Sequence, residues 1–322
     1  MREKDMRLPA IFVILAATAV LAGMADAVHA TPADSPPAVA IFAPGAIAGT
    51  ANDGAAAFTP DGATVVFMRD TGSGSTLMES QREHGRWLAP RAAAFSGHWH
   101  DLDPSMAPDG SFLLFVSNRP ATPGGPPIDA VHAGKRHAGQ GMNLWRVNRQ
   151  GNHWGAPVRL PDTVNVCSLI SSPSIAADGS IYFIGCAGPN GDFKLLQSSY
   201  RDGHYATPHV VALGDADATI RDPAIAPDRS FIVVSVKHAA QGPYRLAIAF
   251  RTPNGWSAPR DLGDAVNGGE SMGAQLGPDH RTLYFYSDRR LPASDPNTAA
   301  TWNNGADHIW QVSLAPWLDA HG

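Results

Sequence analysis

Short apolar runs bounded by turn residues recur along this chain, and each run has the length of one buried β-strand. The clearest example is "DPSMAPDGSFLLFVSNRP" (103–120), in which a Pro-Asp-Gly turn precedes the apolar run from Phe112 to Val116. This pattern predicts a hairpin with a buried second strand. The same pattern recurs at residues 55–70, 172–185, 222–236 and 274–289. The chain therefore contains five copies of one unit.

The spacing of the copies defines a repeat of about fifty residues. The turn aspartates are 48, 69, 50 and 51 residues apart, so one copy carries an insertion; they are Asp61, Asp109, Asp178, Asp228 and Asp279. Each unit also contains a third short strand, such as "NLWRV", and four are followed by an aromatic-x-x-Pro motif such as "GRWLAP" (85–90). Four short strands cannot bury both faces of their sheet alone, so the units must stack as the blades of a propeller do.

The two ends of the repeat region favour a closed ring. The last copy has no aromatic-x-x-Pro strand, whereas "IFAP" (41–44) precedes the first copy without a blade of its own. A strand from the N-terminal side would complete the last blade and pair both open edges. We therefore predict an all-β fold, a single β-propeller of five four-stranded blades over residues 39–318. Six blades are the alternative if one degenerate copy is present.

The first thirty residues are typical of a secretory signal peptide. Three basic residues precede an apolar run from about Leu8 to Gly23, and small-x-small cleavage sites follow. An uncleaved membrane anchor is the alternative, but the apolar run is short for a membrane span. "LAGM" (21–24) has Met24 where a lipoprotein needs cysteine. Residues 1–30 are thus predicted to be removed and residues 31–38 to form a linker, which leaves a soluble periplasmic or secreted protein.

Composition narrows the classes of partner. Of 322 residues, 16% are charged and the formal net charge is −5, so no global basic field exists to attract nucleic acid or anionic lipid. With 32 Gly and 27 Pro, the chain favours many short strands and turns over long helices. We expect a monomer that is not inserted in the membrane after cleavage.

The repeats "DPSMAPDGSFLLFVSNR" and "GWSAPRDLGDAVNGGESMGAQLGPDHRTLYFYSDR" resemble the WD40-like, or PD40, repeats of TolB-type β-propellers. The resemblance covers about residues 40–315 and is specific for the fold rather than for a function. It implies a periplasmic interaction module, although related blades also serve as gating domains of peptidases. The chain has no separate N-terminal α/β domain of the TolB kind, which puts a direct role in the Tol system in doubt.

Two long connections indicate where a site would lie. Residues 118–142 and 288–306 both join the second and third strands of a blade, so they emerge on the same face, which we call the insertion face. Loops carry most propeller functions, so this face is the candidate site. The repeated turn aspartates shape hairpins and are not expected to be catalytic. Arg119 and Arg289, which follow the second strand in two blades, are interpreted as supports for these loops.

The candidate ligand-binding residues are those that break the repeat on the insertion face. The first group is "GHWHD", with His98, Trp99, His100 and Asp101. Its two histidines alternate along a strand and could bind a metal with Asp101 or Asp103, but no strict ligand motif completes the pair, which favours a polar rim of a water-filled channel. The second group lies in the basic loop segment 131–141 and consists of His132, Lys135, Arg136 and His137. Its positive charge would suit an anionic ligand, and a solvated loop is the alternative.

A third group begins the inner strands of the fourth and fifth units. It consists of Arg221, Asp222, Glu270 and Ser271, of which the first three are predicted to contact ligand across the channel from His100. Trp302 is a candidate stacking surface at the channel mouth, with a packed loop tryptophan as the alternative. No nucleophile motif, phosphate loop or zinc spacing occurs, so no cofactor, metal or catalytic residue is predicted.

Two hypotheses follow from these observations. The first is a non-catalytic binding or scaffold protein of the cell envelope that holds a protein, peptide or glycan on the insertion face. The second is a saccharide hydrolase or lyase that uses His98, His100, Asp101 and Glu270, because sites built from several blades leave no contiguous motif. The absence of nucleophile motifs favours the binding protein.

The two cysteines are predicted to form a disulfide. Cys186 follows the second strand of the third unit, and the hairpin register places it opposite a residue four positions from Cys167. Export to an oxidising compartment permits the bond, which would contribute roughly 3 kcal/mol on the chain-entropy model. Two separate buried thiols are the alternative.

Overall fold

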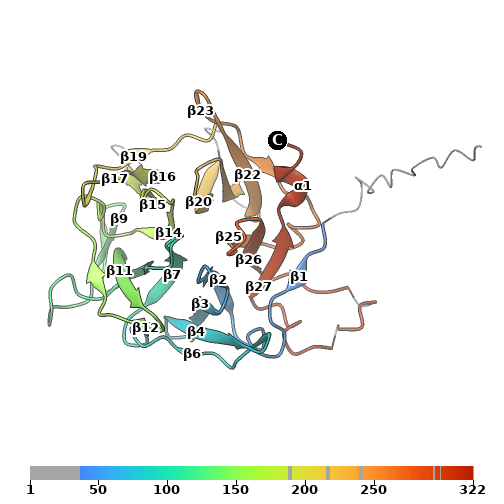
Figure 1. The fold of residues 1–322 in the computed structure, drawn as a ribbon. Helices are drawn as coiled ribbons and strands as arrows, with labels where there is room; N and C mark the ends of the chain where they lie inside the picture. Colours follow the sequence, from blue (N-terminus) through green and yellow to red (C-terminus); the bar gives the residue numbers. More distant parts are fainter. Residues whose placement is uncertain are drawn as a thin grey trace, which may run out of the picture. The chain divides into compact units, whose positions relative to one another are not determined.

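The computed structural model describes residues 37–187, 191–214, 218–238, 242–292, 294–297 and 299–321. Over these residues the chain is almost entirely β-structure, and five sheets form a ring around an axis (Figure 1). The fold is a five-bladed β-propeller, as predicted. The predicted signal peptide and residues 31–36 of the predicted linker lie outside the described residues. No helix among the described residues is long and apolar enough to cross a membrane.

Every blade is an antiparallel sheet whose first strand lies nearest the axis. Blade 1 contains β2 (Asp53–Phe58), β3 (Thr64–Asp70), β4 (Ser75–Glu83), β5 (Arg86–Trp87) and β6 (Arg91–Ala92). Blade 2 contains β7 (Asp101–Met106), β8 (Phe112–Ser117), β11 (Asn143–Gln150), β12 (His153–Trp154) and β13 (Val158–Arg159). Blade 3 contains β14 (Ser171–Ile175), β15 (Ile181–Ala187), β16 (Asp192–Ser198) and β19 (His209–Val210), with the small hairpin β17 (Tyr200–Arg201) and β18 (His204–Tyr205).

The remaining two blades and the appended elements follow the same plan. Blade 4 contains β20 (Thr219–Ile225), β21 (Phe231–Lys237), β22 (Arg245–Thr252), β23 (Gly255–Trp256) and β24 (Arg260–Asp261). Blade 5 contains β25 (Ser271–Leu276), β26 (Thr282–Ser287), β27 (His308–Ser313) and the N-terminal strand β1 (Ala40–Ile41). A hairpin of β9 (Ala130–His132) and β10 (Lys135–His137) lies within the blade 2 insertion, and α1 (Ala315–Leu318) follows β27.

The ring is closed by β1, as the sequence predicted. β1 pairs antiparallel with β27, and the Phe42 N–H donates to the Ile309 carbonyl at 2.9 Å. The Phe42 ring also packs edge-on against three aromatic rings of blades 1 and 5, with centroid distances of 5.3–5.4 Å: Phe58, Trp87 and Tyr284. The first strand therefore covers an otherwise open sheet edge and joins the first blade to the last.

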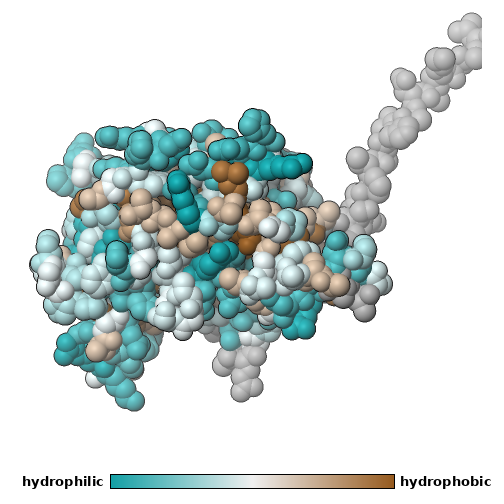
Figure 2. Space-filling model, turned by 90° about the horizontal axis from the view of Figure 1, so that it is seen from below, coloured by the Kyte–Doolittle hydropathy of each residue, from teal (hydrophilic) through white to brown (hydrophobic). Residues whose placement is uncertain are grey.

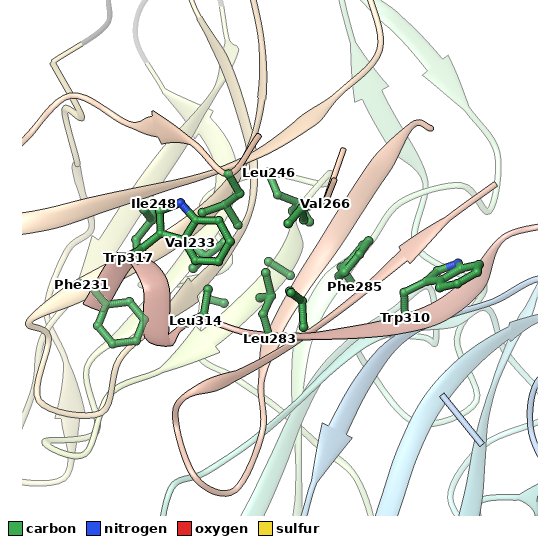
Figure 3. Packing of buried hydrophobic residues seen from close by; sticks show 14 of the residues in the cluster. Phe231, Val233, Leu246, Ile248, Val266, Leu283, Phe285, Trp310, Leu314 and Trp317 are labelled. Carbon is green, nitrogen blue, oxygen red and sulfur yellow. The ribbon is translucent and has the colours of Figure 1, made fainter. Parts of the chain in front are cut away.

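Five apolar clusters fill the spaces between neighbouring blades, one at each interface. The second strands of blades 1 and 2, β3 and β8, contain continuous apolar runs because both of their faces are covered there. Figure 3 shows the cluster between blades 4 and 5, where side chains of β21 and β22 meet those of β26 and β27. Trp317 of α1 packs into the same cluster, so the C-terminal turn also stabilises this interface.

The repeated aspartates have the structural role that was predicted. Each side chain accepts the backbone N–H two residues later, at 2.9–3.0 Å, and so stabilises its turn. At Asp109 the Ser111 hydroxyl and N–H both donate to one carboxylate oxygen, which lowers the pKa of Asp109. These residues shape the face opposite the insertions.

The predicted disulfide is present in blade 3. Cys167 and Cys186 are bonded, with their Cα atoms 6.0 Å apart. The bond joins the segment that leads into β14 to the end of β15. It therefore lies on the insertion face.

Candidate functional site

The two long segments flank blade 1. One follows β8 in blade 2 and the other follows β26 in blade 5, and both blades adjoin blade 1 in the ring (Figure 1). The corresponding connection of blade 1 between β3 and β4 contains only residues 71–74. On the insertion face, blade 1 thus has a short connection between two blades with long ones, and we call this arrangement of residues 71–74, 118–142 and 288–306 the saddle. The side of the molecule seen in Figure 2 is largely hydrophilic, with smaller apolar areas between.

A buried ion pair supports the blade 2 side of the saddle. The Arg119 guanidinium contacts the Asp101 carboxylate at 2.7 Å, and Asp101 is 0% exposed. Arg119 also donates to the Ser117 hydroxyl and lies over the Trp145 ring, 5.2 Å from its centroid. Asp101 is therefore buried under Arg119, which does not favour its predicted role as a ligand contact. The contacts of Arg119 agree with its interpretation as a loop support.

Blade 5 carries the same arrangement in a modified form. Arg289 lies over the Trp310 ring at 5.1 Å and donates to the carbonyls of Ala265 and Val266. Ser271 stands where blade 2 has Asp101, since Ser271 pairs with Ser287 as Asp101 pairs with Ser117. Burial lowers the pKa of Arg289. Both insertions are thus held by an arginine stacked on a tryptophan.

The other members of the first predicted group remain accessible. His98 and His100 are exposed, and Trp99 is partly exposed. The His100 ring packs against Gly74, where a Cβ atom would lie 2.4 Å from the ring, so the blade 1 loop needs glycine there. Among the described residues, no three His, Cys, Asp or Glu side chains are arranged to hold a metal ion.

The basic loop is an exposed hairpin. Lys135 and His137 are exposed, whereas Arg136 forms an ion pair with Asp129. The His132 ring stacks on Phe193 of blade 3, with 5.2 Å between centroids. The Arg221 guanidinium also lies over Phe193, at 4.9 Å from its centroid. The hairpin therefore extends from blade 2 to blade 3.

Around the axis, all five inner strands contain a bulge at the same position. The bulged residues have left-handed φ angles of 46–66°, and they are Ala55, Asp103, Ser172, Asp222 and Gly273. A bulge re-aims the side chain that it carries. Three of these residues precede proline, in "DPS", "SPS" and "DPA", which is a repeated signal that sequence reasoning did not use.

The polar bulge residues form a chain of hydrogen bonds between blades. The Ser172 N–H donates to Asp103 at 2.9 Å, and the Ser172 hydroxyl donates to Asp222 at 2.7 Å. Asp222 also accepts the Ser235 hydroxyl and the Gly273 N–H. Asp222 was predicted to line the axis, but its link to Asp103 was missed because 118 residues lie between them in the chain.

Asp103 is the most perturbed carboxyl group near the axis. Burial, together with the nearby Asp222 carboxylate, raises the pKa of Asp103 to about 6. Burial and the same two carboxylates also raise the pKa of Tyr286. The Tyr286 ring occupies the space beside Gly54 and Gly273, where a Cβ atom would lie 2.7 and 2.2 Å away. A tyrosine and two acidic side chains, all partly exposed, thus lie together near the axis.

The remaining predicted residues do not converge on one point. Glu270 is exposed, and its N–H donates to Asp288. Trp302 is only 7% exposed and packs edge-on against Trp310, which favours the packed-loop alternative over a stacking surface at the mouth. The candidate residues that the sequence placed together on the insertion face therefore do not form one site.

An apolar groove that sequence reasoning missed lies beside the saddle. It has a volume of about 520 Å³, within the roughly 300–1,000 Å³ typical of ligand sites. Its walls come from the 119–124 segment, Trp99, Trp145 and β13, where Val158 is 60% exposed. The two arginines that line it already have carboxylate partners, Asp101 and Asp162. The groove therefore offers an apolar surface without an unpaired charge.

Replacing Asp103 with Asn is expected to stabilise the protein at pH 8 and to have little effect at pH 4. Because the pKa is about 6 in the folded protein and 3.8 ordinarily, the favourable contribution of this group is complete below about pH 4 and is lost as the pH rises through 6. The shift corresponds to about 3 kcal/mol of unfolding free energy. Urea unfolding of the wild type and the variant at pH 4 and pH 8 measures the difference in unfolding free energy between them. The same difference at both pH values would contradict a raised pKa of Asp103.

Asp109→Asn provides a control of opposite sign. The pKa of Asp109 is lowered, so its contribution to stability is present above its ordinary pKa and disappears in acid. This variant should be destabilised at pH 8 and should approach the wild type at low pH.

Comparisons with known proteins identify the fold. No protein-family model matches the sequence, and no curated protein matches it. Among solved structures, hydrazine synthase from Kuenenia stuttgartiensis aligns with a TM-score of 0.50 at 15% identity, over 81% of this chain and 40% of that one. A putative TolB from Agrobacterium tumefaciens aligns with a TM-score of 0.44 at 15% identity, over 76% and 72%. An α-L-arabinofuranosidase from Podospora anserina aligns with a TM-score of 0.45 at 11% identity, over 86% and 94%.

These proteins carry different functions, and the chain spans less than half of the hydrazine synthase chain. At such identities the likeness shows the fold alone. This chain is a five-bladed β-propeller that has TolB proteins and a hydrolase among its structural neighbours.

Proposed function

We propose that this protein is an exported, non-catalytic binding protein that holds a polypeptide ligand in the saddle. The observation that carries the proposal is the placement of both long insertions beside blade 1, next to an apolar groove. Propeller loops held by a rigid ring are suited to binding because the framework orders them before the ligand arrives. The buried Arg119–Asp101 pair anchors the blade 2 insertion in this way.

The chemistry of the groove favours a polypeptide over a glycan. Three of the residues that line it are prolines, which have no N–H to donate: Pro120, Pro123 and Pro157. A glycan would present many hydroxyl groups that need polar partners, whereas the apolar side chains of an extended peptide need none. The exposed Val158 and the partly exposed Trp99 would contact such side chains.

The N-terminal sequence supports export. Its basic residues, short apolar run and small-x-small sites are those of a signal peptide, so the ligand would be met in the cell envelope or outside the cell. The disulfide agrees with such a compartment.

Selection of a random peptide library on the purified protein tests the proposal. We expect the selected peptides to be apolar and to bind Trp99→Ala and Val158→Glu at least tenfold more weakly than the wild type. Val210→Glu is the matched control, since Val210 is 49% exposed on the outer strand of blade 3. Peptides that bind all four proteins equally would refute the groove as the site, and selective binding on a glycan array instead would refute a polypeptide ligand.

A saccharide hydrolase is the second candidate, and one observation favours it. The pKa of Asp103 is about 6, which suits a general acid, and Asp222 lies nearby. The set first considered, with Asp101, is not favoured, because that residue is buried. A panel of nitrophenyl glycosides tests this candidate: hydrolysis that Asp103→Asn abolishes would support it, and no hydrolysis by the wild type would reject it.

A further inference from the structure

We infer that the Cys167–Cys186 disulfide is a redox-sensitive latch for the β9–β10 hairpin of the insertion face. The inference rests on the proposed function only in taking this hairpin as part of the binding surface. The hairpin belongs to blade 2, whereas the disulfide belongs to blade 3. The contacts between the hairpin and blade 3 place the two features next to each other.

The first contact is beside Cys167. The Val131 N–H donates to the Ser168 hydroxyl at 2.8 Å, and the Met142 N–H donates to the Ser168 carbonyl at 2.7 Å. The Asn143 amide also donates to the Cys167 carbonyl at 3.2 Å. The residues that begin and follow the hairpin are thus both bonded to the segment that Cys167 anchors.

The second contact is beside Cys186. The His132 ring stacks on Phe193, and Phe193 is the cross-strand partner of Cys186 in the β15–β16 pair. One covalent bond therefore joins the two pieces of blade 3 on which the hairpin rests. On the blade 2 side, the segments next to the hairpin are bonded to Asn118, since the Ile128 N–H donates to its carbonyl at 2.8 Å and its side-chain amide donates to the Gly139 carbonyl at 2.9 Å. The tip of the hairpin is exposed and basic.

Reduction would remove the covalent link between the two pieces, which stay paired through the β14–β15 ladder. A dithiol reductant supplies two electrons and two protons: one of its sulfurs attacks the disulfide, the S–S bond breaks, both cysteines become thiols, and the reductant closes into its own disulfide. Both cysteines are partly exposed, so a small dithiol can reach them. The hairpin would be held in an oxidising compartment and released in a reducing one.

Hydrogen exchange of the full-length protein, followed by mass spectrometry, tests the latch. Treatment with dithiothreitol, and separately the Cys167→Ser, Cys186→Ser double variant, should increase amide exchange at residues 130–142 at least tenfold. Exchange in β26 and β27 of blade 5 should not change, and reoxidation of the treated protein should restore the original rates.

Two outcomes would overturn the inference. Unchanged exchange at residues 130–142 after confirmed reduction would show that the hairpin does not depend on the bond. A uniform increase in all blades would show a general stabilising clasp instead of a latch. Ser168→Ala is the matched variant, since it removes the Val131 contact while the disulfide remains, and it should increase exchange at Val131 in the oxidised protein. None of these readouts uses a ligand, so failure here leaves the proposed binding function to its own test.

Discussion

Deleting residues 38–48 is expected to prevent stable folding or to lower the melting temperature by more than 10 °C. The deletion removes β1 and Phe42, and so exposes the outer edge of β27 and opens the ring. Phe42→Ala alone should cost about 3–5 kcal/mol, because the ring packs against three aromatic neighbours and is 4% exposed. For a domain of this size, each kcal/mol of lost unfolding free energy lowers the melting temperature by roughly 2–4 °C. Thermal unfolding followed by circular dichroism measures both variants.

Val131→Ala is the control for the substitution at Phe42. Val131 is 57% exposed on the β9–β10 hairpin, so its loss should change stability by no more than about 0.5 kcal/mol. A deletion variant that melts with the wild type would contradict closure by β1.

Arg119→Ala is expected to lower the free energy of unfolding by about 3–5 kcal/mol. The substitution leaves the fully buried Asp101 carboxylate without its charge partner, although the Ser96 hydroxyl still donates to it. It also removes the guanidinium that packs over Phe115 and Trp145. Urea unfolding measures the loss, and the folded variant should also show faster hydrogen exchange in the 118–142 segment.

A double-mutant cycle separates charge from packing. Arg119→Ala with Asp101→Asn should be less destabilised than the sum of the single variants, because no buried charge then remains unpaired. Arg91→Ala is the matched control: its ion pair with Glu79 is longer, at 3.3 Å, and Arg91 is 73% exposed, so less than about 1 kcal/mol should be lost. Equal losses at Arg91 and Arg119 would contradict the role given to burial.

The candidate site was only partly predictable, and the reason is visible in individual residues. Trp99 was identified because it breaks the repeat on the insertion face and Asp222 because it begins an inner strand, and both lie where a ligand or a neighbouring blade can contact them. Asp101 and Trp302 break the repeat as well, but they do so as buried supports. A residue that departs from the repeat therefore has a role of its own. The departure does not show whether the residue supports a loop from inside or contacts a ligand at the surface.

The sequence by itself determined the three long strands of each blade, their turns, the number of blades and the closing strand, whereas the short outer strands and the β9–β10 hairpin were not predicted one by one. The predicted features depend on local properties: short apolar runs, a Pro-Asp-Gly turn and a missing strand in the last repeat. The disulfide was also predicted from a hairpin register, but that register is shifted in the structure: the bulge in β14 pairs Ser171 with Ile184 instead of Cys186, which brings Cys186 closer to Cys167.

Only the tertiary structure decided which distant groups meet. Asp103, Ser172 and Asp222 come together because a bulge in each inner strand turns one side chain toward its neighbours around the axis, where the inner strands of blades 2, 3 and 4 pack against one another. Ring closure then places the insertions of blades 2 and 5 on both sides of blade 1. Whether a side chain such as Asp101 is buried depends on what packs over it, and in this protein Arg119 covers it.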